Sequence, residues 1–111
     1  MRGDAKVLDF LNRQLKNELT AVNQYFLHYR MLAHWGFGAM AKRERDESIE
    51  EMKHADELIE RILMLDGLPN LQNLGKLFIG QSPREALECD LKLEHQALPD
   101  LKAGIVDCEL A

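Results

Sequence analysis

The chain has 111 residues, of which 46% are hydrophobic, and its 14 basic and 19 acidic side chains give a formal net charge of −5. This length suits a single domain, and the hydrophobic share excludes a disordered chain. The acidic balance disfavours nucleic acid as a partner, and no apolar run approaches the roughly 18 residues that a membrane span needs.

A long amphipathic helix is predicted over about residues 4–34, because apolar residues recur there at steps of three and four. These residues are Val7, Leu11, Leu15, Val22, Phe26 and Tyr29. Asp4 is a suitable N-cap for this helix, and Gly36 suits the position that follows its end.

A second helix is predicted over about residues 39–66, ending at Gly67, which Pro69 follows two positions later. The connection 67–81 exceeds the roughly two to eight residues usual between helices, and it is rich in leucine. We therefore expect it to lie along the helices rather than in water. Long crossovers occur in some helix bundles, so the helices on either side of it could run parallel.

A third helix is predicted over about residues 83–111, because Ser82 and Glu85 form a capping box around Pro83. Pro99 should kink this helix or interrupt it locally. No strand is predicted anywhere, so the fold class is all-α.

Two cysteines, Cys89 and Cys108, lie on this third predicted helix. Their separation along the helix is far beyond the reach of a disulfide. Two free thiols fit a reducing compartment, which predicts a cytoplasmic protein.

Carboxylates occupy core positions on the apolar stripes of all three helices: Glu18 on the first, Glu51 on the second and Glu94 on the third. A buried carboxylate is costly unless it is paired, hydrogen-bonded or bound to a metal. Glu51 and His54 form a Glu-x-x-His pair on one helix face, and single glutamates from facing helices complete the ligand set of di-iron carboxylate bundles. These donors suit iron or manganese, with zinc as an alternative.

The ordinary alternative is a solvated acidic face, because a Glu-x-x-His pair arises easily by chance in a chain this rich in glutamate. Glu47 shares the stripe of Glu51 but lies near the helix start, where a solvated acid is expected. His28, His34 and His95 have no ligand-like neighbours and are expected at the surface.

A second apolar face runs along the first two helices. Its members are Leu19, Asn23 and Phe26 on the first helix and Ile49, Met52 and Ile59 on the second. A bundle of three helices cannot bury two apolar faces on each of its first two helices. We therefore expect the chain to self-associate, most simply across a two-fold axis. Two Met52 thioethers would then face each other and could bind haem iron, with ordinary packing as the alternative.

From Met1 to about Glu109 the chain resembles the bacterioferritins, the haem-containing branch of the ferritin-like proteins. The segments that carry the resemblance are NELTAVNQYF at 17–26, ESIEEMKHAD at 47–56, GLPNLQ at 67–72 and CDLKLE at 89–94. It implies a ferritin-like four-helix bundle domain over 1–111, with a long crossover between the second and third helices and only the first three helices present.

The resemblance also implies a function. Bacterioferritins assemble into a hollow shell of twenty-four subunits, oxidise Fe(II) with dioxygen or peroxide at a di-iron ferroxidase centre, and store Fe(III) mineral. Glu18, Glu51, His54 and Glu94 match the metal ligands and catalytic residues, and Met52 matches the axial ligand of haem b between subunits. A small ferredoxin is the implied partner for iron release, and the shell is a homo-oligomer or contains a second subunit type.

The resemblance further implies a fourth helix with a second Glu-x-x-His, in a chain roughly one and a half times as long. Two of the six family ligands are therefore expected to be absent. This leaves open a non-catalytic structural or haem-carrying shell subunit, and a plain helical interaction module.

Three further residues have two interpretations each. Tyr25 could hydrogen-bond to a bridging ligand or donate an electron, and ordinary core packing is the alternative. Asp46 and Glu50 could bind iron at the inner wall of a shell, with a solvated acidic face as the alternative.

Overall fold

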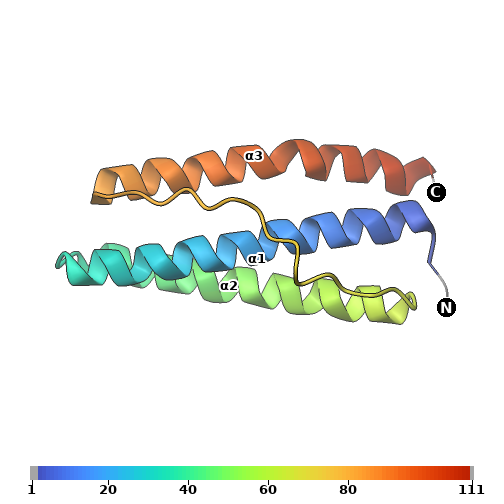
Figure 1. Ribbon diagram of the computed structural model, residues 1–111, viewed down its shortest axis with the longest axis horizontal. Coiled ribbons are helices and arrows are strands. Elements are labelled where there is room, and N and C mark those ends of the chain that lie inside the picture. Colours follow the sequence, from blue (N-terminus) through green and yellow to red (C-terminus); the bar gives the residue numbers. More distant parts are fainter. Residues whose placement is uncertain (1–2, 111) are drawn as a thin grey trace.

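The computed structural model describes residues 3–110, including all of their side chains except those of residues 100, 103, 104 and 106–110. Three helices make up the fold: α1 (Ala5–His34), α2 (Gly38–Met64) and α3 (Pro83–Leu110). The described residues contain no strand, so the all-α prediction is confirmed. Figure 1 shows that α2 and α3 run parallel to each other and antiparallel to α1, as the long connection indicated.

The ends of the helices follow local chemistry. The Asp4 carboxylate accepts a hydrogen bond from the Lys6 N–H (2.8 Å) and caps α1, as predicted. The Ser82 hydroxyl accepts from the Glu85 N–H (3.2 Å) at the start of α3, which confirms the predicted cap. Helix α2 ends at Met64, close to its predicted end, but Asp66 rather than Gly67 takes the left-handed conformation after it (φ 58°).

Helix α3 continues through Pro99 to Leu110, so the predicted local interruption does not occur. Proline removes one backbone hydrogen bond and leaves the carbonyl four residues earlier without its helical partner. Both residues concerned, Pro99 and His95, are exposed here. None of the helices over residues 3–110 combines the length and apolar character needed to cross a membrane.

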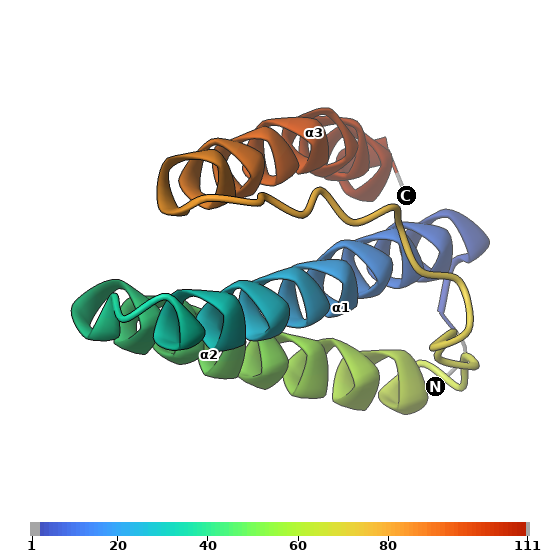
Figure 2. The same cartoon turned by 60° about the vertical axis from the view of Figure 1, so that its left-hand side comes forward.

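The connection between α2 and α3 runs back along α1, as expected (Figure 2). Its backbone N–H groups donate to a ladder of α1 side chains spaced four residues apart. The pairs are Gly75 with Thr20 Oγ1 (2.8 Å), Phe78 with Gln24 Oε1 (2.9 Å) and Gly80 with His28 Nε2 (3.0 Å). Leucine packing has a smaller part than the sequence indicated, because Leu68, Leu71 and Leu74 are exposed.

Helix α1 is the centre of the described fold. Leu15 packs with Ala55 and Ile62 between α1 and α2, whereas Tyr25 packs with Leu93 between α1 and α3. Over the described residues, no Cα atom of α2 lies within 8 Å of one in α3. The side of α3 that faces away from α1 is therefore not covered.

This arrangement corrects the predicted inward stripe of the third helix. Leu87, Leu91, Glu94, Leu98 and Leu101 are all exposed. The buried face of α3 lies one position away along the helix and contains Ala86, Asp90 and Leu93. Burial of the predicted stripe would need a second neighbouring helix, whereas α1 is the only helix that α3 packs against in the described chain.

Replacing Gly80 by alanine is expected to lower the free energy of unfolding by about 1–3 kcal/mol. An added Cβ would lie 2.2 Å from the Ala86 backbone nitrogen, which belongs to the first turn of α3 and cannot rotate away. Gly38→Ala is the matched control, because no atom lies within 4 Å of a Cβ at that position. Urea unfolding of both variants measures the difference, and equal stabilities would contradict the expected clash.

Candidate metal centre

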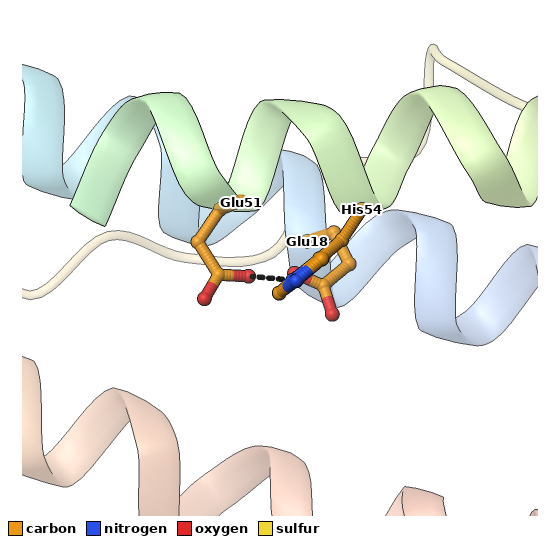
Figure 3. A group of neighbouring side chains, drawn as sticks. All are labelled: Glu18, Glu51 and His54. Atoms are coloured by element: carbon orange, nitrogen blue, oxygen red, sulfur yellow. Dashed lines mark ion pairs between the residues drawn. The ribbon is translucent and has the colours of Figure 1, made fainter. Parts of the chain in front are cut away.

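Three of the four predicted ligands come together at the middle of α1 and α2. The atom His54 Nδ1 lies 3.5 Å from Glu51 Oε2 and 3.7 Å from Glu18 Oε2. Figure 3 shows the three side chains converging from the two antiparallel helices. Leu15 and Ala55, which belong to the core between these helices, lie within about one turn of the ligands and fix their register.

Glu94, the fourth predicted ligand, lies across an open pocket of about 370 Å³ that Glu18 and Glu51 also line. It does not belong to the group within 4.8 Å that contains Glu18, Glu51 and His54. Its carboxylate accepts a hydrogen bond from the Tyr25 hydroxyl (2.6 Å), and Tyr25 is otherwise buried in the core between α1 and α3. Tyr25 therefore packs in the core, and its hydroxyl hydrogen-bonds to a predicted ligand, a contact that aims Glu94 at the pocket.

The electrostatics of the site favour a bound cation. Burial and the negative charge of Glu94 raise the pKa of Glu51, and the neighbouring His54 only partly opposes this effect. Glu18 Oε2 is buried and has no hydrogen-bond partner. A buried acceptor without a donor is costly, and a metal ion would satisfy it while removing the repulsion between the carboxylates.

The same contacts determine the protonation state of the Tyr25 hydroxyl. Burial and the hydrogen bond to Glu94 raise the pKa of the Tyr25 hydroxyl, so the phenol keeps its proton and remains a donor. The resulting donor set is carboxylate oxygens with one imidazole nitrogen. Such a set fits iron or manganese, because both accept hard oxygen ligands together with histidine.

The other acidic candidates lie in solvent. Glu47 is exposed, as predicted. Asp46 pairs with Lys42 (3.3 Å) and Glu50 with Lys53 (3.9 Å), and all four of these side chains are more than half exposed. These contacts favour the solvated acidic face over an iron site at Asp46 and Glu50.

The second apolar face is exposed as the sequence indicated. Met52 is 54% exposed and Phe26 is 59% exposed. Cys89 is free, as expected, and the side chain of Cys108 lies outside the described residues.

The prediction for His28 is wrong, because its side chain is completely buried. It forms a second cluster with Glu44 and Asp90, which sequence reasoning missed. The sequence did contain a signal for this cluster, because Glu44 lies on the same inward stripe as Glu51, and Asp90 lies one turn before Glu94. His34 and His95 are exposed, as predicted.

The chain is similar to a family model and to several known proteins. A family model described as the ferritin-like domain matches residues 8–110. A bacterioferritin of Rhodobacter capsulatus is 60% identical over 98 residues, which cover 88% of this chain and 61% of that protein. A bacterioferritin of Mycobacterium leprae is 53% identical over 108 residues, which cover 97% of this chain and 68% of that protein.

The fold also matches a solved structure. A bacterioferritin structure from Rhodobacter capsulatus, described as having a metal-free dinuclear site and a haem iron in a crystallographic special position, superposes with a TM-score of 0.96 at 55% sequence identity. The match covers 98% of this chain and 68% of that chain. The chain therefore spans about two thirds of the length of these relatives.

Proposed function

The chain belongs to the bacterioferritins within the ferritin-like family, and on this premise we propose that it binds Fe(II) for oxidation and storage. The proposed ligands are Glu18, Glu51, His54 and Glu94. The observation that carries the proposal is the convergence of Glu18, Glu51 and His54, with one buried carboxylate oxygen that lacks a hydrogen-bond partner. A second subunit or a further helix would have to supply the remaining ligands of a full di-iron centre.

Iron is the substrate in this proposal, and the ligand set makes its oxidation favourable. Carboxylates stabilise Fe(III) more than Fe(II), so they lower the reduction potential and favour electron transfer to dioxygen or peroxide. His54 is a neutral donor that keeps the site from becoming too anionic. Tyr25 holds Glu94 on the opposite wall of the pocket through its hydrogen bond.

Aerobic addition of Fe(II), followed by absorbance in the near ultraviolet, tests this proposal. We expect oxidation faster than in buffer alone, with Fe(III) retained by the protein in a shell-like assembly. Oxidation at the buffer rate, with Fe(II) still bound by the protein, would instead favour a non-catalytic shell subunit. Oxidation at the buffer rate without bound Fe(II) would contradict the site itself.

We also propose that two chains associate through the face around Met52 and bind haem b between them. The face combines exposed Met52 and Phe26 with half-buried Leu19, Ile49 and Ile59. A two-fold axis through it would bring two Met52 thioethers to opposite sides of one haem. Bound haem would provide an electron-transfer group next to the stored iron.

Replacing Met52 by leucine is expected to remove the thioether ligand while keeping the apolar surface. Titration with haem should give the spectrum of a six-coordinate haem shared by two parent chains, and Met52→Leu should change that spectrum. Met64→Leu is the control, because Met64 is also an exposed methionine on α2 but points about 120° away from Met52 around the helix. An unchanged spectrum in Met52→Leu would show that Met52 is not an axial ligand.

A further inference from the structure

A buried polar network joins the three helices and the crossover at a place separate from the candidate metal ligands. Its side chains are Gln24 and His28 on α1, Glu44 on α2 and Asp90 on α3, and none of them is more than 7% exposed. Buried polar groups of this kind must satisfy one another, because water does not reach them. The donors and acceptors can therefore be assigned one by one.

The hydrogen bonds to the crossover determine where the protons are. The Gly80 N–H donates to His28 Nε2 (3.0 Å), so this nitrogen has a free lone pair and His28 Nδ1 carries the proton of a neutral imidazole. His28 Nδ1 donates to Asp90 Oδ1 (2.8 Å), and the Gln24 amide donates to the same oxygen (3.0 Å). Asp90 is therefore the acceptor at the centre of the network.

Asp90 is also the ionised member. Burial alone would raise the pKa of Asp90, but the hydrogen bonds from His28 and Gln24, together with the neighbouring Glu44 carboxyl group, outweigh burial and lower it. Its second oxygen, Oδ2, is buried and has no partner among the N–H and O–H groups of the described residues. The network thus leaves one strong acceptor that needs a donor.

Glu44 can supply this donor only by keeping its own proton. Glu44 Oε1 is also buried without a hydrogen-bond partner, and one of its carboxyl oxygens lies within 4.8 Å of Asp90. Two ionised carboxylates at this separation in a buried site would repel each other strongly. The groups that face the pair are neutral His28 from α1, Glu47 from α2, and the Gly80 backbone from the crossover. Glu47 adds a further negative charge.

We propose that Glu44 and Asp90 share one proton at neutral pH, and that this shared proton links α2 directly to α3. The link matters because the Cα atoms of α2 and α3 stay more than 8 Å apart throughout the described residues. Where the proposed iron function also holds, the same link positions Glu94, one turn after Asp90, relative to Glu51. The shared proton itself does not depend on that function.

A metal site is the competing interpretation, since histidine, glutamate and aspartate are common ligands. The hydrogen bonds argue against it. His28 Nε2 accepts from the crossover, and His28 Nδ1 carries a proton that it donates to Asp90. A metal ion could bind either nitrogen only by removing that proton or breaking the crossover contact.

The pH dependence of urea unfolding tests the proposal without iron. Burial, the hydrogen bond to Asp90 and the charges of Asp90 and Glu47 raise the pKa of Glu44 from 4.5 to about 9. Between these two pH values the Glu44 carboxyl keeps its proton in the folded chain but has lost it in the unfolded chain. Glu44 therefore makes stability fall as pH rises. The unfolding equilibrium constant should increase by up to about tenfold per pH unit. Above about pH 9 both states are ionised and the effect ends.

Three variants separate the possible outcomes. Glu44→Gln keeps a hydrogen-bond donor but has no proton to lose, so its stability should exceed that of the parent by a margin that grows from about pH 5 to about pH 9. Glu57→Gln, at an exposed position on α2 that does not face the pair, should follow the parent. Asp90→Asn removes the ionised partner and should reduce the pH dependence assigned to Glu44. If the stability of Glu44→Gln fell with rising pH as steeply as that of the parent, the proposal would be overturned.

Infrared spectroscopy provides a second test that needs no stable variant. The folded parent at pH 7 should show the carbonyl stretch of a protonated carboxyl group, which Glu44→Gln should lose and Glu57→Gln should keep. Absence of this band in the parent would overturn the shared proton. A rise in the unfolding midpoint on adding Mn²⁺ that Glu44→Gln abolishes would overturn it in favour of a metal site.

Discussion

Replacing Glu51 by alanine is expected to slow Fe(II) oxidation by about 100-fold or more, because Glu51 lies at the centre of the proposed ligand set. It faces His54 at 3.5 Å and, with Glu18 and Glu94, lines the same pocket. Losing it would remove a carboxylate that stabilises Fe(III) and would leave His54 without its partner on the same helix. Stopped-flow absorbance after aerobic mixing with Fe(II) measures the rate.

The stability of the metal-free chain separates this loss from simple unfolding. Burial and the charge of Glu94 raise the pKa of Glu51, so its ionised form is disfavoured in the folded state. Removing the carboxylate should therefore leave the unfolding midpoint at neutral pH unchanged or higher. Glu47→Ala, at an exposed position one turn earlier, should keep the parent rate. A Glu51→Ala variant that oxidises Fe(II) at the parent rate would contradict the assigned ligand set.

Replacing His28 by alanine is expected to lower the free energy of unfolding by about 3–5 kcal/mol, because the substitution leaves buried polar groups without partners. The Gly80 N–H would lose its acceptor, and Asp90 would lose a donor that stabilises its charge. The completely buried ring would also leave a cavity. Equilibrium urea unfolding gives the magnitude.

The matched control is His34→Ala, at an exposed position near the end of the same helix, which should change stability by no more than about 0.5 kcal/mol. Hydrogen exchange adds a local measurement, because the Gly80 amide should exchange faster in His28→Ala than in the parent. Equal stability of the two histidine variants would mean that the network does not hold the crossover against α1.

The helices were predictable from the sequence because their signals are local. The apolar spacing around Leu15, the cap at Asp4 and the cap at Ser82 each depend on residues within a few positions. The convergence of Glu18 with Glu51 and His54 followed from a longer argument. Both helices must turn their apolar stripes toward a common core, and Leu15 and Ala55 pack in that core next to the ligands.

The features that sequence reasoning missed depend on distant segments. His28 was expected at the surface, and its burial follows from the crossover, whose backbone N–H groups need acceptors along α1. The spacing of Thr20, Gln24 and His28 by four residues was visible in the sequence, but its meaning required knowing that the crossover lies on that face. Periodicity alone cannot say which polar stripe another segment will cover.

The exposed stripe of α3 has a related cause. Leu91 and Glu94 follow a helical period that predicts burial, but burial also requires a neighbouring element on that side. Among the helices of the described chain, α3 packs only against α1, so the face opposite the candidate ligands stays open. For the same reason the distance between Glu94 and Glu51 depends on the separation of α2 and α3, which no local pattern encodes.

Anomalous scattering at the iron edge, from crystals of the parent chain soaked anaerobically in Fe(II), tests the central claim most directly. We expect an iron peak within about 2.2 Å of ligand atoms of Glu18, Glu51 and His54. Iron found instead between Asp46 and Glu50, or beside His28 and Asp90, with none at Glu51, would contradict it.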